Sequence, residues 1–282
     1  MNDRRLPYLN FGCGGLFHPS WVNADLHPAS VEVLKVRFAQ RLPFEDGTFE
    51  VAYHSHVLEH FTLEAARFLL AECRRVVRPG GTIRVVVPDL EFAARTYLDS
   101  IAGEGSPDHL ARHRFAVIHL IDLCARNESG GQWDRFLLES SEREAAIAAE
   151  ISGAGSMQAR ESLRAREQKR RKKKPLMRRA FTLSTYSHSA RRVALRLMGV
   201  REEDWRAGLF RRKSGEPHLW MYDRVSLSQM LIDAGFAEPK VCGPAESRIP
   251  DWGSFHLDVD AAGRVIRPNS LYMEATVQAN KA

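Results

Sequence analysis

Cysteine is scarce in this sequence, and long apolar runs are absent. The chain has four cysteines and no CxxC pair, which argues against a zinc ribbon or a disulfide framework and favours a reducing compartment. No run of about 18 apolar residues occurs, and the start, Met1-Asn2-Asp3-Arg4-Arg5, lacks the apolar stretch of a signal peptide. We therefore expect a cytoplasmic protein that neither spans a membrane nor is secreted. The cysteines are Cys13, Cys73, Cys124 and Cys242.

An even distribution of basic charge is also missing. The net charge is +6, but residues 160–179 hold eleven Lys or Arg against two Glu, a local charge of +9 that leaves the rest of the chain at −3. The run Lys169-Arg170-Arg171-Lys172-Lys173-Lys174 is either a solvated surface or a contact for phosphate-bearing substrates, an anionic membrane surface or RNA. In the membrane case the protein would be peripheral at the inner face.

The chain is long enough for more than one unit. Its 282 residues, with 44% hydrophobic residues, predict a real core and either one large domain or a domain with an insertion. In the first hundred residues, short apolar runs alternate with turn signals, which predicts an α/β fold around a parallel sheet. Strands are expected at Tyr8–Cys13, Trp21–Leu26, Val33–Phe38, Phe49–His54 and Thr82–Pro88. A helix from Leu63 to Val77 should stop at Pro79-Gly80-Gly81.

Charged, helix-favouring stretches replace the strands in the middle of the chain. We predict a helical insertion over residues 101–215, and a sheet domain made of residues 1–100 and 216–282. In the last part we expect a helix at Ser226–Ala234 and strands at Lys240–Cys242 and Ser270–Val277. The insertion is the expected lid or substrate region, with His119, Tyr186, His188 and Trp205 as candidate pocket residues.

A glycine turn follows the first expected strand. Gly12-Cys13-Gly14-Gly15 leaves backbone amides free to meet a ligand without an intervening side chain, although many strands end in a purely structural glycine turn. Asp25 ends the second expected strand, where a carboxylate can accept hydrogen bonds from both hydroxyls of a ribose, or can instead stabilise a turn. The pair favours a nucleoside ligand.

Five blocks then occur in the order seen in class I S-adenosylmethionine-dependent methyltransferases, which this sequence resembles. They are Gly12-Cys13-Gly14, Asp25, Leu42-Pro43-Phe44 with Asp46 and Phe49, Val57-Leu58-Glu59-His60, and Arg78-Pro79-Gly80-Gly81. The resemblance covers Tyr8 to Asp89, and more loosely Trp220 to Glu274. It implies a Rossmann-like, doubly wound, mostly parallel seven-stranded sheet. The tail from Ser247-Arg248-Ile249-Pro250 to Glu274 resembles a subgroup associated with surface-polysaccharide and glycan biosynthesis.

The resemblance also implies a cofactor site for S-adenosylmethionine. Gly12, Cys13 and Gly14 would contact its methionine part and Asp25 its ribose, with Leu26 beside the adenine. Asn10 stands where the family usually has an acid, so the contact to the cofactor's amino group is made differently. The short stretch between Gly14 and Trp21 leaves room for a turn and not for the usual helix. Ala39, Gln40 and Leu42 would border the base, and His54 and Ser55 would close the pocket.

Candidate catalytic groups follow the fourth and fifth expected strands. Methyl transfer to a hydroxyl needs alignment and a proton acceptor, and His56 and His60 have side chains suited to that role. The alternative for Glu59 and His60 is to brace the following helix, and Asp89 either orients the acceptor or caps the helix that starts at Leu90. The pattern His56-x-x-Glu59-His60 also matches a zinc-peptidase motif. We disfavour that alternative and assign no metal.

The residues after the fourth strand narrow the choice of acceptor. His54-Ser55-His56-Val57 lacks the Asn/Asp-Pro-Pro-aromatic clamp of base-amine methylation and the cysteine nucleophile of pyrimidine-carbon methylation. We expect an enzyme that O-methylates a sugar or related small molecule. The alternative is a nucleic-acid-binding methylase or a non-catalytic cofactor-binding protein. A polar and aromatic cluster of His218, Trp220, Tyr222 and Asp223 borders the acceptor or is merely structural.

Overall fold

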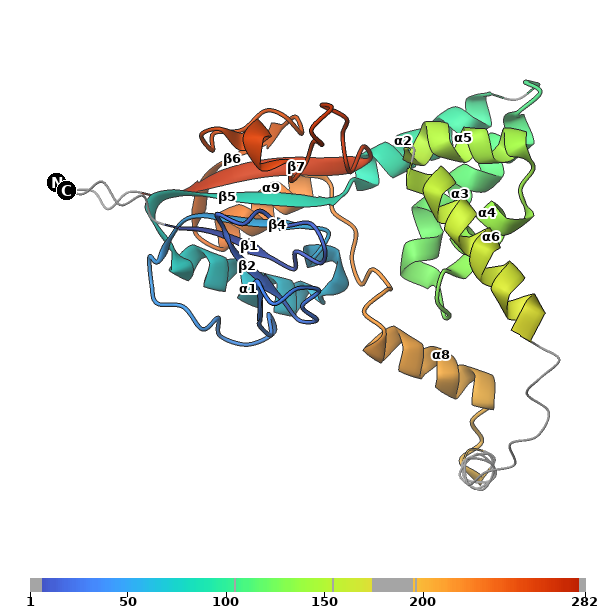
Figure 1. The fold of residues 1–282 in the computed structure, drawn as a ribbon, viewed down its shortest axis with the longest axis horizontal. Helices are drawn as coiled ribbons and strands as arrows, with labels where there is room; N and C mark the ends of the chain where they lie inside the picture. Colours follow the sequence, from blue (N-terminus) through green and yellow to red (C-terminus); the bar gives the residue numbers. More distant parts are fainter. Residues whose placement is uncertain (1–6, 104, 154, 174–194, 196, 279–282) are drawn as a thin grey trace. The chain divides into compact units, whose positions relative to one another are not determined.

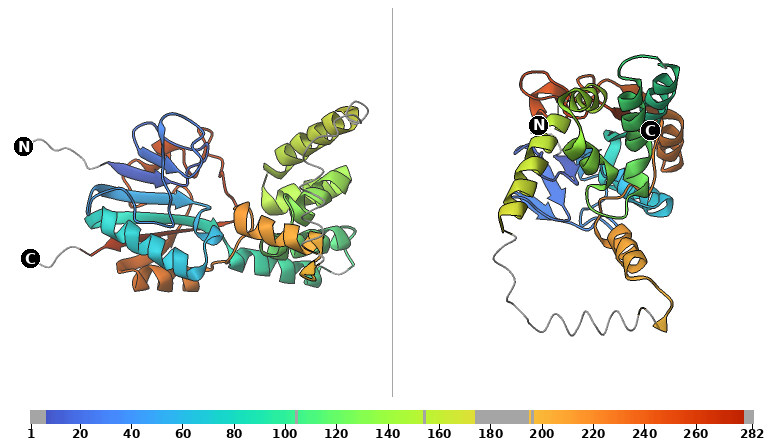
Figure 2. Two further views of the ribbon diagram at one scale, coloured as in Figure 1. Left: turned by 90° about the horizontal axis from the view of Figure 1, so that it is seen from below. Right: turned by 90° about the vertical axis from the view of Figure 1, so that its right-hand side faces the viewer.

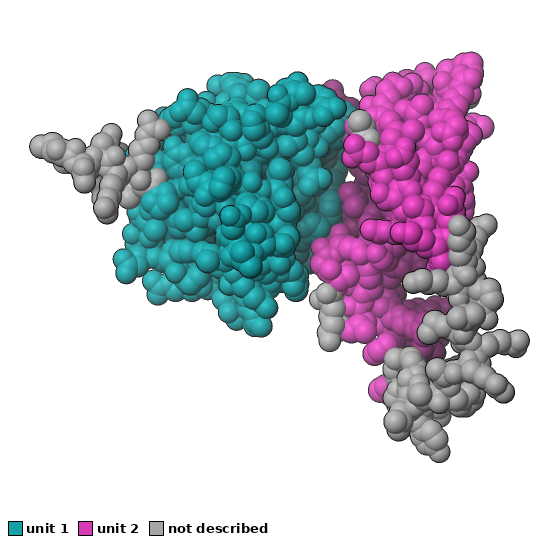
Figure 3. All heavy atoms as spheres, viewed as in Figure 1, with its two compact units in different colours: residues 1–94, 218–282 teal, residues 95–217 magenta. Residues whose placement is uncertain are grey.

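A computed structural model describes residues 7–103, 105–153, 155–173, 195 and 197–278. The chain divides into two compact units (Figure 3). The first consists of Met1–Ala94 and His218–Ala282, and the second of Arg95–Pro217. The sequence predicts these divisions at 100/101 and 215/216.

The first unit is built on a seven-stranded sheet of order β3-β2-β1-β4-β5-β7-β6 (Figure 1). Five strands pair in parallel, and β7 runs antiparallel between β5 and β6. This topology confirms the Rossmann-like, mostly parallel fold. The strands are β1 (Tyr8–Phe11), β2 (Val22–Asp25), β3 (Val33–Lys35), β4 (Phe49–Ser55), β5 (Val77–Pro88), β6 (Phe236–Cys242) and β7 (Ser270–Val277).

Two helices pack on one face of this sheet. Thr62 caps α1 (Leu63–Val76) through its side chain, and Asp223 caps α9 (Arg224–Asp233) in a reciprocal capping box with Ser226. Buried residues of both helices join alternate strand residues in one apolar core, and both helices are visible from below in Figure 2. Residues of this core include Leu9, Phe11, Ala52, Leu69, Leu70, Val85, Leu231 and Met273.

The opposite face is covered by the segment between β6 and β7, which contains the short 3-10 helix η2 (Trp252–Phe255). Trp21, Tyr53, Trp252 and Tyr272 share a second buried core there, with ring centroids of Tyr53 and Trp252 5.2 Å apart. Aromatic edges packed in this way bury large apolar areas. This core positions the tail of the chain over β4 and β5.

One fully buried arginine lies within the second core. Arg84 in β5 is 0% exposed and forms ion pairs with Asp258 at 2.8 Å and Glu274 at 2.7 Å. Its remaining donors reach the backbone carbonyls of Gly243, Pro244 and Glu246. A buried guanidinium needs such complete pairing, because an unpaired buried charge is strongly destabilising. Arg84 therefore links the sheet to the tail segment.

The first long helix ends within one residue of the expected position before Pro79-Gly80-Gly81, but these three residues belong to a strand. The helix ends at Val76, and these three residues lie inside β5. The pairing of β4 with β5 shifts register between Phe49 and Val51, and a Cβ at Gly81 would lie only 2.5 Å from the carbonyl oxygen of Glu50. Glycine is thus needed here for close approach of two strands.

The second unit is helical. It contains most of α2 (Leu90–Ala102), and α3 (His109–Ala125), α4 (Gly131–Glu139), α5 (Glu142–Ser152), α6 (Gly155–Lys173) and α8 (Glu202–Lys213). Phe115, Phe136 and Ile147 are buried in it. Arg160, the first residue of the basic segment, is also buried and donates to the carbonyls of Leu137 and Ser140. No helix in the described part of the chain combines the length and the hydropathy of a membrane span.

Candidate active site

The glycine turn joins β1 to β2 through backbone hydrogen bonds. The amide of Gly12 donates to the carbonyl of Ala24 at 2.8 Å, and Gly12 and Gly14 have φ of 65° and 54°. Such values favour glycine. A Cβ at Gly12 would collide with Val57, so this part of the turn packs directly on the residues after β4. In the described chain no helix lies between β1 and β2, in agreement with the short spacing.

Asp25 faces this turn from the end of β2. One carboxylate oxygen accepts the amide of Gly14 at 2.8 Å and the other accepts the amide of His27 at 2.7 Å. A carboxylate has about four lone-pair sites, so each oxygen keeps capacity for another donor. A Cβ added at Gly14 or Gly15 would meet nothing within 4 Å. Open space beside Gly14 and Gly15, together with the half-buried carboxylate of Asp25, fits the ribose end of a nucleoside cofactor.

Asn10 and Cys13 are buried at the glycine turn. The buried amide of Asn10 donates to the carbonyl of Leu16 and to the Oδ1 of Asn23. Cys13 is buried, and burial, with the charge of Asp25 second, raises the pKa of its thiol to about 11. The side chain of Asn10 is thus engaged in holding the loop, which gives a structural reason for an amide at this position.

The residues expected around the adenine divide into two groups. Leu26, Ala39 and Gln40 are exposed, and Ser55 is half-buried at the carboxyl end of β4. Leu42 and His54 are instead buried in the core, with exposures of 2% and 0%. Leu42 packs in the apolar core and its amide donates to Glu72. These two side chains offer no surface to a cofactor in this structure, in contrast to our expectation.

His54 is a buried imidazole beside the ring of Phe11, with centroids 4.8 Å apart. Neither ring nitrogen has a hydrogen-bond partner among the residues described, and burial lowers the pKa of His54 to about 3. Burial disfavours the charged form because the ion loses its hydration. His54 therefore remains neutral in the folded protein over most of the acid range.

This burial predicts a measurable loss of stability in acid. Below the ordinary pKa of 6.5, the unfolded chain binds a proton at His54 and the folded chain does not, so stability falls as pH falls. Between pH 7 and pH 5 we expect His54 to contribute a loss of about 2 kcal/mol in unfolding free energy. Urea unfolding of the wild type and of His54→Phe at both pH values measures this. Equal losses in the two proteins would contradict it.

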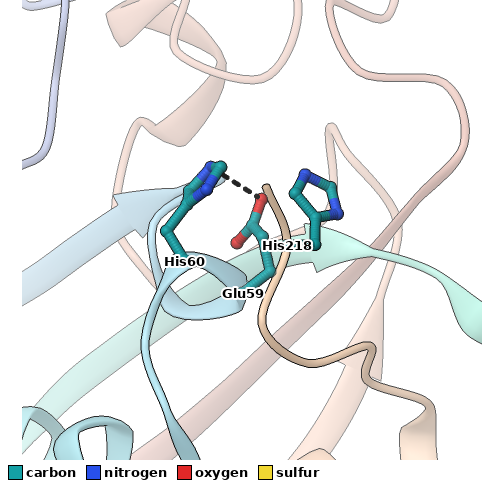
Figure 4. Close-up of side chains that lie close together, drawn as sticks. All are labelled: Glu59, His60 and His218. Carbon is teal, nitrogen blue, oxygen red and sulfur yellow. Dashed lines mark ion pairs between the residues drawn. The ribbon is translucent and has the colours of Figure 1, made fainter. Parts of the chain in front are cut away.

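A cluster of polar side chains lies just after β4. Glu59 and His60 belong to the 3-10 turn η1 (Leu58–His60), and His218 comes from the distant segment that re-enters the sheet unit (Figure 4). The rings of His60 and His218 are 5.0 Å apart. The carbonyl of Glu59 accepts the amides of Leu219 at 2.7 Å and Trp220 at 3.3 Å. These backbone bonds hold the two segments together.

The carboxylate of Glu59 is the centre of this cluster. It is 0% exposed, with His56 Nδ1 at 3.3 Å and His60 Nε2 at 3.9 Å from Oε1. Neither of its oxygens accepts a hydrogen bond from another described residue. Burial raises the pKa of Glu59 to about 8, opposed in part by Arg267. A buried carboxyl without donors is unusual and requires a physical reason.

His56 is constrained on several sides. Its backbone is left-handed, with φ of 55°, and its Nε2 lies 2.8 Å from the hydroxyl of Ser270. Burial, followed by the charge of Arg267, lowers the pKa of His56 to about 3. A left-handed, non-glycine residue stores strain that the surroundings must balance. Both ring nitrogens of His56 thus face protein atoms.

Asp89 follows β5 at the same edge of the sheet as the glycine turn. Its Oδ1 accepts the amide of Glu91 at 2.9 Å, and its own amide donates to Asn269. The carboxylate therefore caps the first turn of α2, which is the structural alternative considered for this residue. Burial is the main cause that raises its pKa.

The zinc-peptidase pattern lacks its structural context. That motif places its two histidines one turn apart on a helix, with the glutamate between. Here His56 has a left-handed backbone, and Leu58–His60 form a single 3-10 turn before α1. His56 and His60 are thus not related by helical spacing, and the peptidase alternative loses its geometric basis.

The helical unit has a cavity of its own. A space of about 720 Å³ lies between α3, the start of α4 and α8, lined by Ile118, Asp122, Arg126, Gln132 and Ala207 among others. The expected pocket residues His119 and Trp205 are not among the residues that line it. His119 is half-buried, with its pKa lowered by burial to about 4, and Trp205 lies on α8. Tyr186 and His188 lie outside the described residues.

One family model matches part of the sheet unit. Residues 9–85 match the family model described as a methyltransferase domain. This segment is therefore similar to methyltransferase domains. It contains the glycine turn, Asp25, Glu59 and His60, but not His218. A comparison with curated proteins finds no match.

Several solved structures align with the chain at low similarity. A CurJ carbon methyltransferase is 8% identical with a TM-score of 0.38, covering 99% of this chain and 50% of that one. A complex of the Haloferax volcanii Trm112 methyltransferase activator with a putative methyltransferase is 10% identical, covers 99% and 85%, and has a TM-score of 0.35. A methyltransferase from Mesorhizobium loti is 12% identical, covers 96% and 90%, and scores 0.35. The chain thus spans half the length of the CurJ structure.

Proposed function

We propose that the protein transfers a methyl group from S-adenosylmethionine to an oxygen of a saccharide or a related small molecule. The observation that carries this proposal is the contact between the glycine turn and the residues after β4. Strands β1 and β4 are neighbours, and Gly12 packs against Val57, two residues before Glu59. Groups able to handle a hydroxyl therefore lie next to the predicted cofactor cradle.

The cofactor contacts are those that the family resemblance implies, and the geometry of the turn supports them. The backbone of Gly12 and Gly14 would hold the methionine part, and the remaining lone pairs of Asp25 would accept the ribose hydroxyls. The exposed side chains of Leu26, Ala39 and Gln40 would border the adenine. When bound, S-adenosylmethionine supplies an electrophilic methyl group.

The acceptor must be aligned and must lose a proton. His56 and His60 are the candidate bases, and their side chains are exposed to nearly the same extent, 26% and 28%. Asp89 would orient the acceptor only in addition to capping α2. A hydroxyl acceptor fits because no nucleophilic cysteine or base-amine clamp comes after β4. The resemblance of the tail to a glycan-related subgroup favours a saccharide.

Several arginines of the basic segment, residues 160–179, already form ion pairs within the protein, which lowers the charge left for a ligand. Arg160 and Arg164 pair with Glu142, and Arg170 pairs with Glu167. Residues 174–179, with Leu176 and Met177, lie outside the described residues. Contact of residues 160–179 with an anionic membrane surface or a phosphate-bearing substrate stays a proposal, as does a cytoplasmic location.

Methyl transfer is testable directly. We expect the purified protein to transfer label from methyl-labelled S-adenosylmethionine to one member of a panel of sugars, nucleotide sugars and lipid-linked glycans. The product should carry the label on an ether oxygen, because an O-methyl group survives mild base whereas a methyl ester does not. His60→Asn should lower kcat by at least about tenfold. Label found only in nucleic acid would instead support a nucleic-acid methylase.

A further inference from the structure

Glu59, His60 and His218 form a group that no step of the proposed function fully explains. Their candidate ligand atoms all lie within 4.8 Å of one another (Figure 4). The three side chains come from two segments far apart in sequence, held in place by the bonds from Leu219 and Trp220 to the carbonyl of Glu59. Their meeting is therefore a property of the fold and not of local sequence.

The buried carboxylate of Glu59 favours a cation at the centre of this group. Both oxygens of Glu59 and the hydroxyl of Tyr222 are buried without a hydrogen-bond partner among the described residues. Leaving a buried polar group unsatisfied costs about 1–3 kcal/mol, and more for a charged group. A cation between the carboxylate and the two imidazoles would compensate this cost.

The distances are close to those of a metal centre. Glu59 Oε1 lies 3.9 Å from His60 Nε2. Two ligands at about 2.1 Å from a tetrahedral zinc ion are about 3.4 Å apart, so small side-chain rotations would suffice. His60 is 28% exposed, which leaves the group open to solvent on that side and available for exchange of an ion.

We propose that Glu59, His60 and His218 bind a divalent transition-metal ion. Two imidazoles and one carboxylate suit zinc, manganese, cobalt or iron(II), whereas magnesium and calcium prefer oxygen ligands alone. Three protein ligands leave at least one coordination position for water or substrate. This assignment departs from the sequence analysis, which assigned no metal, because only the fold brings His218 to the pair.

The metal ion would also activate the methyl acceptor, and this role rests on the proposed function. An acceptor hydroxyl bound at the open position would lose its proton more readily, because a metal ion stabilises the alkoxide. In that arrangement His60 would act as a ligand, and the proton of the hydroxyl would pass to solvent water on the exposed side of the group. The location beside Gly12 and Val57 places the ion near the proposed methyl donor.

Metal binding can be measured without any methyl acceptor. The full chain is stripped with a chelator, dialysed against Zn²⁺, Mn²⁺ or Co²⁺, and analysed for bound metal by mass spectrometry. We expect one equivalent of at least one ion, a rise in melting temperature on binding, and visible Co²⁺ bands that report nitrogen ligation. Glu59→Gln and His218→Asn should weaken binding at least about tenfold.

The control is His256→Asn, an exposed histidine of the same unit with φ of 53°, a backbone angle that asparagine tolerates. It should bind metal as the wild type does. His60→Asn, at a partly exposed position, keeps the test valid if a buried variant fails to fold. No uptake by the wild type, or equal uptake by all folded variants, would overturn the proposal. Metal uptake without methyl transfer would count against the proposed function alone.

Discussion

Replacement of Arg84 by methionine is expected to lower the free energy of unfolding by about 3–5 kcal/mol, the range found when one partner of a buried ion pair is removed. Asp258 and Glu274 would remain buried, with exposures of 0% and 2%, and would lose their shared cation. The three carbonyls that accept from the guanidinium would also lose their donor. Urea unfolding at pH 7 measures the change.

Two further variants separate the burial of charge from general damage. Arg264→Met removes an arginine that pairs with Asp260 at the surface, and it should change stability little, because exposed ion pairs contribute little. Adding Asp258→Asn and Glu274→Gln to Arg84→Met should restore part of the loss, because the unpaired charges are gone. A loss for Arg84→Met as small as that for Arg264→Met would refute the argument.

Asp25→Ala is expected to weaken S-adenosylmethionine binding by at least about 100-fold, because two charge-assisted hydrogen bonds of about 1.5–3 kcal/mol each would be lost. The variant also frees the amide of Gly14, which Asp25 holds at 2.8 Å, so the cradle loses rigidity. Calorimetry with S-adenosylmethionine and its demethylated product gives the two affinities.

The comparison must exclude unfolding as the cause. Asp251→Asn alters an exposed aspartate of the same unit whose φ of 57° asparagine can adopt, and it should bind the cofactor normally. Melting curves of both variants report whether each remains folded. Normal affinity in a folded Asp25→Ala protein would remove the basis for the ribose contact.

Much of the fold could be predicted because its signals are local. The apolar runs around Leu9, Ala52 and Val85 indicate the strands, and the helix at Leu63 follows from its spacing. The boundaries are harder to predict, since residues 79–81 have the composition of a turn although they lie in β5. Pairing with β4 overrides a local breaker signal here.

The polar interior could not be predicted, because it depends on contacts between distant residues. A strand buried on both faces shows no alternation, so nothing in the sequence marks His54 as facing the helix side or Arg84 as facing the tail. The partners of Arg84 are Asp258 and Glu274, far along the chain. The sequence groups His218 with Tyr222, but its place beside Glu59 results only from the re-entry of the chain.

The antiparallel strand β7 has a consequence for biosynthesis. It pairs with β5 along Thr82 to Pro88, yet the ribosome makes the whole helical unit between them. Until β7 emerges, β5 is an open edge able to pair with other chains, and Arg84 lacks the carboxylate of Glu274. The nascent protein thus passes through a stage that is prone to aggregation, and a truncation before residue 270 would arrest it there.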